Sequence, residues 1–214
     1  MMEERAQRIV DAAIELADEG GFQNVRLREV AERSGVAFGT LYARFNSKED
    51  ILIAALEQEI SKFRDLMADV PVPGDSTRER VRYFFSALTD VLLSRTGFAK
   101  AVLRAVASGV PGVADKVISY QTTMNCLIVG AIKGIAVKYV EETDHNADIF
   151  FTARMMQSLW FAELIGWISE VVTREEVIQR TLRGCNLLLS GLEATEGNTG
   201  ISPETLAPVS NTEG

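Results

Sequence analysis

Apolar residues recur with the spacing of an α-helix along almost the whole chain, and no segment shows the strict alternation typical of a β-strand. Residues Ile9, Ala12, Ala13, Leu16 and Ala17 share one helical face, and the glycine pair that follows ends this first helix. The pattern predicts an all-α fold of about nine helices. The others are expected at residues 27–34, 38–45, 47–67, 76–94, 97–107, 113–139, 143–170 and 173–192.

Proline and small polar residues divide the chain. Pro71 and Pro73 lack an amide hydrogen, so the fourth helix cannot continue through them. The last residues are rich in Gly, Ser, Thr, Asn and Pro and cannot bury enough apolar surface to offset the entropy of ordering. We therefore expect a small helical domain at 1–48, a larger helical domain at 49–193 with a connecting helix at 47–67, and a disordered tail at 194–214.

The composition indicates a folded protein with no membrane partner. Hydrophobic residues make up 47% and charged residues 24% of the 214 residues. The apolar stretch 126–140 is interrupted by Lys133 and Lys138 and falls short of the roughly 20 residues of a membrane span. The start of the chain does not resemble a signal peptide, because Asp11 and Glu15 interrupt its apolar run. We expect a cytoplasmic protein.

Few residues suited to catalysis or metal binding are present. Cys126 and Cys185 lie far apart in the sequence and are expected to be two buried thiols. The one histidine, His145, lies in a polar stretch and is expected to be solvated near a helix start. Neither a nucleophile with its base nor a metal-binding spacing accompanies it. The sequence therefore predicts a protein that is not an enzyme and has no cofactor and no metal.

Residues 25–45 have the pattern of a helix-turn-helix, in which two short helices meet across a turn led by Gly35. A glycine suits that turn because the residue after a helix end often takes a left-handed conformation. In the second of these helices Leu41 and Phe45 share the inner side, whereas Gly39 and Ala43 lie opposite. Such a bare outer face can approach DNA base edges closely, with Thr40, Arg44, Phe38 and Tyr42 on its flanks.

The local charge of this segment has the opposite sign to that of the chain. The formal net charge is −8 overall, which excludes DNA binding through total charge. From Arg26 to Lys48, however, five basic and two acidic residues give a net charge of +3. A phosphate-binding surface requires such a local excess of positive charge. A helical hairpin with merely solvated charges remains the alternative.

The segment 35–48, read as GVAFGTLYARFNSK, closely resembles the signature of the TetR family of bacterial transcriptional regulators, and the resemblance covers about residues 5–56. It implies a dimeric repressor whose N-terminal domain reads DNA and whose larger domain binds a small molecule that releases the DNA. The stretch 158–191 also resembles the branch that includes repressors of steroid and lipid breakdown. The DNA contacts that the resemblance implies are Arg28, Ala37, Phe38, Gly39, Thr40, Tyr42 and Lys48.

This chain departs from the family pattern at two helix caps. The family usually has a hydroxyl residue near positions 26 and 37, where this chain has Arg26 and Ala37. Ala37 cannot cap the recognition helix, which costs on the order of 1 kcal/mol. Phe38 also replaces the polar residues often found there.

The C-terminal part predicts burial on every side of one helix. Apolar residues surround the helix that includes 150–168, and a single monomer can hardly bury all of its faces. We expect one side to line a cavity and the other to pack, with the last helix, in a four-helix dimer interface that includes Trp167 and Leu188. Glu163 is expected to be an ordinary partly exposed acid or a charge at the rim of the dimer interface, with the anchoring of a polar ligand group as the alternative.

Adaptable apolar side chains in this part are either ordinary core or the lining of a pocket for a bulky apolar effector, and the sequence does not separate the two. The candidates for the pocket are Phe84, Phe85, Leu88, Leu92, Phe98, Leu103, Met124, Ile128, Met155, Met156 and Trp160.

These features favour a ligand-responsive transcriptional regulator. We expect a repressor that binds double-stranded operator DNA as a homodimer and is released by a bulky apolar or acyl-type small molecule. The alternative is an all-helical protein-interaction module, which would have no affinity for DNA.

Overall fold

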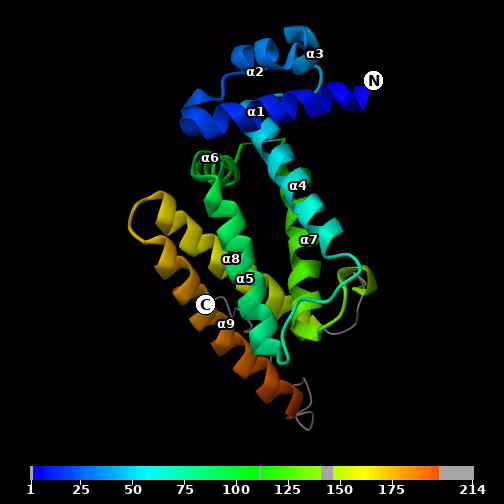
Figure 1. Ribbon diagram of the computed structural model, residues 1–214, viewed down its shortest axis with the longest axis vertical. Coiled ribbons are helices and arrows are strands. Elements are labelled where there is room, and N and C mark those ends of the chain that lie inside the picture. Colours follow the sequence, from blue (N-terminus) through cyan, green and yellow to red (C-terminus); the bar gives the residue numbers. More distant parts are fainter. Residues whose placement is uncertain (1, 111, 141–146, 198–214) are drawn as a thin grey trace, which may run out of the picture.

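The computed structural model describes residues 2–110, 112–140 and 147–197, and within them the chain is all helical, as the sequence pattern predicts (Figure 1). His145 lies outside the described residues, as do residues 198–214 of the disordered tail expected at 194–214; residues 194–197 of that tail are helical instead. The elements are α1 Met2–Asn24, α2 Leu27–Ser34, α3 Phe38–Tyr42, α4 Lys48–Leu66, α5 Thr77–Ser94, α6 Thr96–Ala107, α7 Ala114–Lys133, the 3-10 turn η1 Val137–Tyr139, α8 Ala147–Ile168 and α9 Arg174–Gly197.

Helices α1, α2 and α3 form a small unit at one end of the molecule, here called the head, and α4 to α9 form the larger body (Figure 1). The head has its own apolar core, in which Ile9, Val30 and Leu41 are at most 1% exposed. Helix α1 bends where Gly20 and Gly21 leave the helical conformation, with φ of −151° and 67°. The predicted helix end at this glycine pair is therefore a kink, after which the helix resumes.

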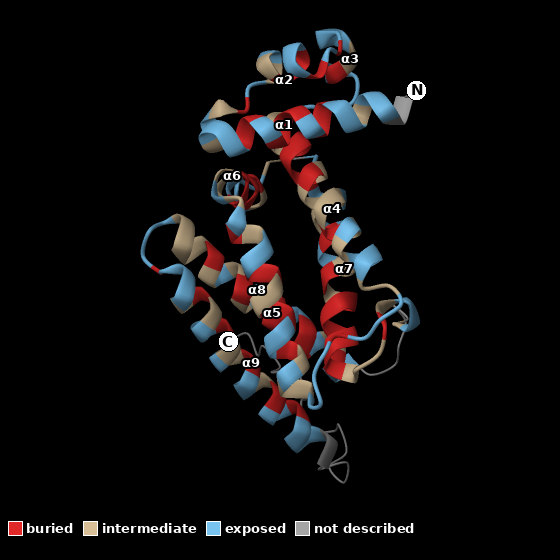
Figure 2. Ribbon diagram, in the orientation of Figure 1, coloured by how far each residue is buried: buried red, intermediate tan, exposed pale blue. Residues whose placement is uncertain are grey.

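The body core runs between α5, α7, α8 and α9, as the buried residues in Figure 2 show. Helices α8 and α9 lie antiparallel along one side of it, and Gly184 of α9 allows the side chain of Leu159 to approach its backbone. Ser76 begins α5 with a complete capping box in which Glu79 is the partner. At the start of α4, Ser47 accepts a bond from the Asp50 amide.

Helix α6 connects the two parts more closely than the sequence suggested. Its residues Phe98, Ala101, Val102 and Ala105 belong to the apolar core of the head. The first turn of α6 abuts α1, where a Cβ on Gly97 would stand 2.8 Å from the carbonyl oxygen of Asp18. Helix α4 follows the head directly in the chain, and α6 is a second, packed connection between body and head.

Several helix ends differ from the predicted ones. Helix α3 ends at Tyr42 instead of residue 45, although the amides of Arg44 and Phe45 still donate to the carbonyl of Leu41, and the chain is extended at Ser47, where α4 is capped. Helix α7 ends at Lys133 instead of residue 139, since Gly134 takes the left-handed conformation with φ of 69°. Arg80 donates hydrogen bonds to the carbonyl oxygens of Ala131 and Ile132, which stabilises this end. Helix α9 continues to Gly197, beyond the expected residue 192.

Across the described ranges, every helix is too short or too polar to cross a lipid bilayer.

Candidate nucleic-acid interface and internal cavity

Helix α3 presents a surface with few side chains on its outer face. Leu41 and Phe45 are buried toward the head core, at 0% and 4% exposure. On the outer side a Cβ added at Gly39 would meet nothing within 4 Å, so packing does not require this glycine. Ala37 and Ala43 are exposed as well. The backbone of α3 is thus open to close approach by a partner.

Two aromatic side chains stand at the edge of this bare face. Phe38 is 40% and Tyr42 49% exposed, and their rings meet edge to face with centroids 4.8 Å apart. Exposed aromatic rings held against each other keep a fixed shape while their outer edges stay available for contacts. Thr40, which lies between them in α3, is half-buried. The outer face of α3 thus combines an accessible backbone with two exposed aromatic rings, which suits contact with base edges.

The turn before α3 follows from Gly35, which takes the left-handed conformation with φ of 63°. The amide of Val36 then donates to the carbonyl of Ala31 at 3.1 Å, which closes the end of α2. Neither Arg26 nor Ala37 makes a side-chain cap bond, in keeping with their lack of hydroxyl groups. Helix α3 therefore begins without a side-chain cap, and Leu41 with Phe45 anchors this segment in the head core.

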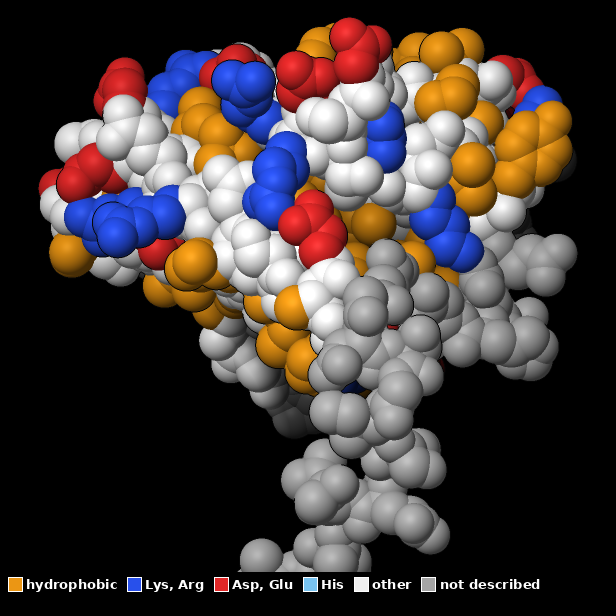
Figure 3. Space-filling view, turned by 90° about the horizontal axis from the view of Figure 1, so that it is seen from below, with side chains coloured by type: hydrophobic (Ala, Val, Ile, Leu, Met, Phe, Trp, Pro, Cys, Tyr) orange, Lys and Arg blue, Asp and Glu red, His pale blue; other side chains and the backbone are white. Residues whose placement is uncertain are grey.

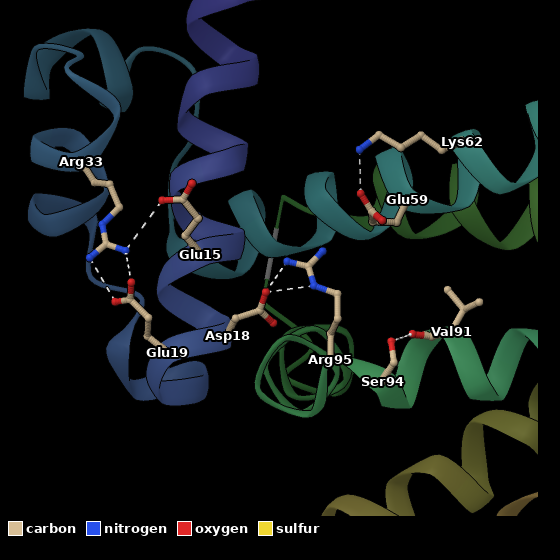
Figure 4. A network of polar contacts seen from close by, with 9 residues as sticks. All are labelled: Glu15, Asp18, Glu19, Arg33, Glu59, Lys62, Val91, Ser94 and Arg95. Atoms are coloured by element: carbon tan, nitrogen blue, oxygen red, sulfur yellow. Dashed lines mark hydrogen bonds and ion pairs between the residues drawn. The ribbon is translucent and has the colours of Figure 1, made fainter.

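The basic side chains of this segment differ in whether they pair with a carboxylate. Arg28 and Arg44 are exposed, and neither pairs with a carboxylate in the described part of the chain. Arg33 instead binds Glu19 of α1 at 2.5 Å and lies 3.8 Å from Glu15, which holds the pKa of the Glu19 carboxyl below its ordinary value (Figure 4). Arg33 thus supports the head and does not face outward with α3.

Lys48, at the start of α4, makes two contacts with Phe22 of α1. Its ammonium donates a hydrogen bond to the carbonyl of Phe22 at 3.2 Å and lies 3.7 Å from the centroid of the Phe22 ring. The side chain is half-buried. It therefore ties α4 to the end of α1, a contact that the sequence did not indicate. The unpaired positive surface of the head is accordingly smaller than the net charge of the segment suggested.

The described surface at the opposite end of the molecule has charges of both signs. Seen from that end, acidic and basic side chains are interspersed where no grey residues cover the view, and hydrophobic side chains lie in groups between them (Figure 3). A phosphate-binding face needs an excess of one charge, and the visible part of this end does not show one.

The body contains a cavity of about 470 Å³ bounded by α4, α5, α6, α7 and α8. Cavities of roughly 300–1,000 Å³ with mostly apolar walls are typical of small-molecule sites. Six of the eleven side chains predicted to line a pocket are on its wall. They are Leu88, Leu92, Phe98, Leu103, Met124 and Trp160.

The other five predicted lining residues lie off the cavity wall. Phe84, Phe85, Ile128 and Met156 are at most 1% exposed and fill the body core, where the Phe84 and Phe85 rings meet edge to face at 5.2 Å. Met155 is half-buried and also lies off the wall. These residues are on faces of α5, α7 and α8 that pack on neighbouring helices.

Polar residues on the cavity wall were missed by the sequence reasoning, although their helical spacing was a usable signal. Gln121 and Asn125 are one turn apart on α7, on the face that also carries Met124. The Nε1 of Trp160 donates to Thr89 at 2.9 Å, so this indole is already satisfied. The further polar lining residues are Glu59, Arg95, Thr122, Arg154, Gln157 and Ser158.

The predicted dimer-interface residues lie on α8 and α9. Trp167 and Leu188 are both partly buried against the body core of their own chain. Next to Leu188, the side chain of Leu187 is 71% exposed and points away from that core. Glu163 lies off the cavity wall, and Arg180 of α9 stands 3.9 Å from its carboxylate.

Comparison with known proteins identifies the family of this chain. The family described as bacterial regulatory proteins, tetR family, matches residues 9–55, which cover most of the head and the start of α4. The repressor KstR of Rhodococcus jostii (strain RHA1), an HTH-type transcriptional repressor, is 31% identical over 186 residues, 87% of this chain and 83% of that protein. The chain belongs to the TetR family of transcriptional regulators. The KstR repressor of Mycobacterium tuberculosis (strain H37Rv) is 27% identical over 87% of this chain and 81% of its own length.

Solved structures of TetR-family members share the whole architecture of this regulator. A TetR transcriptional regulator from Rhodococcus sp. RHA1 superposes with a TM-score of 0.73 at 27% identity, covering 88% of this chain and 96% of that one. Thermus thermophilus FadR, solved in complex with lauroyl-CoA, has a TM-score of 0.66 at 20% identity, covering 96% and 100% of the two chains. The family expected from the sequence is confirmed, the KstR relatives bear out the resemblance to the branch that includes repressors of steroid and lipid breakdown, and the relatives compared are regulators.

Proposed function

We propose that this protein is a ligand-responsive repressor that binds an inverted-repeat operator as a homodimer and leaves it when a bulky apolar or acyl-type molecule enters the body cavity. The observation that carries the proposal is the pairing of two surfaces in one chain. The outer face of α3 is bare at Gly39 and flanked by exposed aromatic rings, and a largely apolar cavity lies behind α6. The regulator would act in the cytoplasm, where its DNA is.

The DNA contacts are assigned to residues 1–48, which include the head and the first residue of α4. In a helix-turn-helix the second helix enters the major groove. Gly39 lets the backbone approach the bases, Phe38 and Tyr42 contact thymine methyl groups or sugars, and Thr40 and Ala37 face the groove at its edge. Arg28, Arg44 and Lys48 contact phosphates, with Lys48 held in place by Phe22.

The effector is assigned to residues 49–193. Its site has polar groups spaced along a mostly apolar wall, which suits an elongated molecule with a polar end. The acyl-CoA in the T. thermophilus FadR structure shows that the same fold in that protein accommodates an acyl chain. Repression would follow from occupancy of the operator, and release from a body conformation that spaces the two heads differently.

The dimer is assigned to α8 and α9. Leu187 is exposed on α9, and Trp167 lies on the neighbouring helix. A two-fold dimer of this kind predicts half-sites about one DNA turn, or a multiple of it, apart.

Selection of genomic DNA fragments by the purified protein, followed by sequencing, tests the proposal. The expected result is a set of fragments that share one inverted repeat bound with nanomolar affinity at physiological salt. A protein without DNA affinity at any salt concentration would instead be the protein-interaction module. A head variant, Gly39→Glu, is the matched control and should select no motif, because its charge would face the groove while its Cβ meets no protein atom within 4 Å.

A further inference from the structure

Arg95 lies where the cavity, the body and the head meet. It ends α5 and begins α6, and its side chain is part of the cavity wall. Its Nε donates to the carboxylate of Asp18 on α1 at 2.9 Å, and its Nη2 donates to the same oxygen (Figure 4). One arginine thus borders the ligand space and holds a residue of the head.

The guanidinium of Arg95 has capacity for a further partner. Its Nη1 makes no hydrogen bond to any residue in the described ranges, and 40% of the side chain is exposed. An arginine can bind two carboxylates at different edges of its planar group, or exchange one for the other. Because exposed ion pairs are weak, the bond to Asp18 does not bar such an exchange.

The other charges on the cavity wall do not substitute for Arg95. Glu59 is engaged by Lys62, whose Nζ donates to it at 2.8 Å. Arg154 is exposed on α8, and its guanidinium lies 5.7 Å from the ring of Phe151. Among the described residues of the cavity wall, Arg95 is the cation that lies next to the head and could meet a molecule with an anionic end.

We propose that Arg95 recognises an anionic group on an otherwise apolar effector, and that this contact competes with the bond from Arg95 to Asp18. The inference rests on the proposed function and specifies the chemistry of its ligand. A carboxylate, or a phosphate on an acyl carrier group, satisfies the geometry of the guanidinium. A neutral apolar molecule of the same size would fill the cavity without drawing Arg95 from α1.

The position of Gly97 turns this exchange into a signal. Gly97 is in the first turn of α6, two residues after Arg95, and packs against the backbone of Asp18 without a side chain between them. Loss of the ion pair removes a polar bond at the point where α6 packs directly on α1, so a shift of α6 caused by the ligand reaches the head through this contact. Ligand and DNA then prefer different arrangements of this contact, and each must weaken the other's binding by the same factor.

Two probes of equal chain length test the inference, dodecanoate and dodecan-1-ol, because only the first is charged at pH 7.5. Binding is measured by calorimetry on the wild type and on Arg95→Gln, and DNA release by fluorescence anisotropy on a selected operator fragment. We expect the wild type to bind dodecanoate about tenfold more tightly than the alcohol and Arg95→Gln to lose this preference. Asp18→Asn should bind dodecanoate about fivefold more tightly, because Arg95 is free.

The matched control is Arg174→Gln, which removes an exposed ion pair between α9 and Asp90 of α5 at 2.8 Å, outside the cavity. It should keep the full preference for dodecanoate. The inference is overturned if Arg95→Gln keeps the preference, if Arg154→Gln removes it instead, or if the wild type binds both probes equally or neither. Calorimetry needs no DNA, so absence of operator binding would count against the proposed function alone.

Discussion

The Cα of Gly97 lies so close to the backbone carbonyl oxygen of Ala17 that no side chain fits between them. This contact is between the first turn of α6 in the body and α1 in the head, residues that are eighty positions apart in the sequence. It makes α6 a direct support of the head. A body movement that shifts α6 must therefore shift α1 with it.

Gly97→Ala should force α6 and α1 apart. Alanine in an exposed helix normally stabilises by up to about 1 kcal/mol relative to glycine. Here the clash with rigid backbone outweighs that gain, and overpacking of this kind costs about 1–3 kcal/mol. We expect a lower free energy of unfolding in urea and weaker operator binding. Gly39→Ala, whose added methyl meets nothing within 4 Å, is the control and should unfold no more easily than the wild type. Equal stability of the two variants would refute the tight contact.

Lys48→Ala should weaken binding to operator and random DNA alike. The loss of one phosphate contact lowers the slope of log affinity against log salt concentration by about 1. Its bond to the Phe22 carbonyl is also lost, so a modest fall in thermal stability is expected as well. Arg33→Ala is the matched control, because Arg33 is occupied by Glu19 and should leave the salt slope unchanged. A change of sequence preference without loss of affinity would contradict the role of Lys48.

The sequence was sufficient for the fold class, the family and the local form of the head, because these depend on contacts between near neighbours. Gly35 was predicted to take the turn and Leu41 to face inward, and both predictions rest on residues a few positions away in the sequence. Which face of a helix lines a cavity depends on where other helices lie. Leu88 lines the cavity and Phe84, one turn earlier on the same helix, fills the core, although both are apolar. Helical periodicity cannot separate them.

Long-range polar contacts were beyond prediction for the same reason. Arg95 and Asp18 are both ordinary charged residues in sequence, and only the packing of α6 on α1 makes them partners. The bond from Lys48 to Phe22 likewise depends on the direction that α1 takes after its kink at Gly20 and Gly21. The glycine pair permits such a kink, but the sequence alone does not give its direction. The sequence indicated that Lys48 could contact phosphate, yet not that it is held in place.

Cys185 should react slowly with thiol reagents in the folded protein. Burial raises the pKa of its thiol to about 12, so little thiolate is present at pH 8. The unfolded chain has the lower, ordinary pKa, so it loses the proton first and the folded state loses stability as the pH rises from about 9 toward 12. Reaction with Ellman's reagent at pH 8 should be fast in guanidinium and slow in buffer. Cys185→Ser measured in parallel assigns the signal, and rapid modification of Cys185 in the native protein would contradict its burial.

Leu187→Glu should yield a monomer. Leu187 is exposed on α9, whereas Leu188 is packed against the core of its own chain, so a charge at 187 tests the dimer with the least damage to the fold. Sedimentation velocity at micromolar concentration should show a monomer for this variant and a dimer for the wild type, and operator binding should be lost with the dimer. Leu66→Glu, at an 81% exposed leucine at the end of α4, is the control and should remain dimeric. A wild type that is itself monomeric would disprove the assignment.

Filling the cavity should block the response to ligand while leaving DNA binding intact. Leu88 of α5 and Met124 of α7 both line the 470 Å³ cavity, so Leu88→Trp or Met124→Trp occupies room that an acyl chain needs. A ligand shifts the regulator only as far as it binds one conformation better than the other, and a tenfold loss of affinity corresponds to about 1.4 kcal/mol of binding free energy. We expect each variant to need at least tenfold more dodecanoate to release a selected operator fragment, measured by fluorescence anisotropy. Ile128→Val removes one methyl group from α7 off the cavity wall and should release DNA at the wild-type concentration, with only a small loss of stability. If both tryptophan variants respond like the wild type, the effector binds elsewhere, because no acyl chain could share the narrowed space with an indole ring.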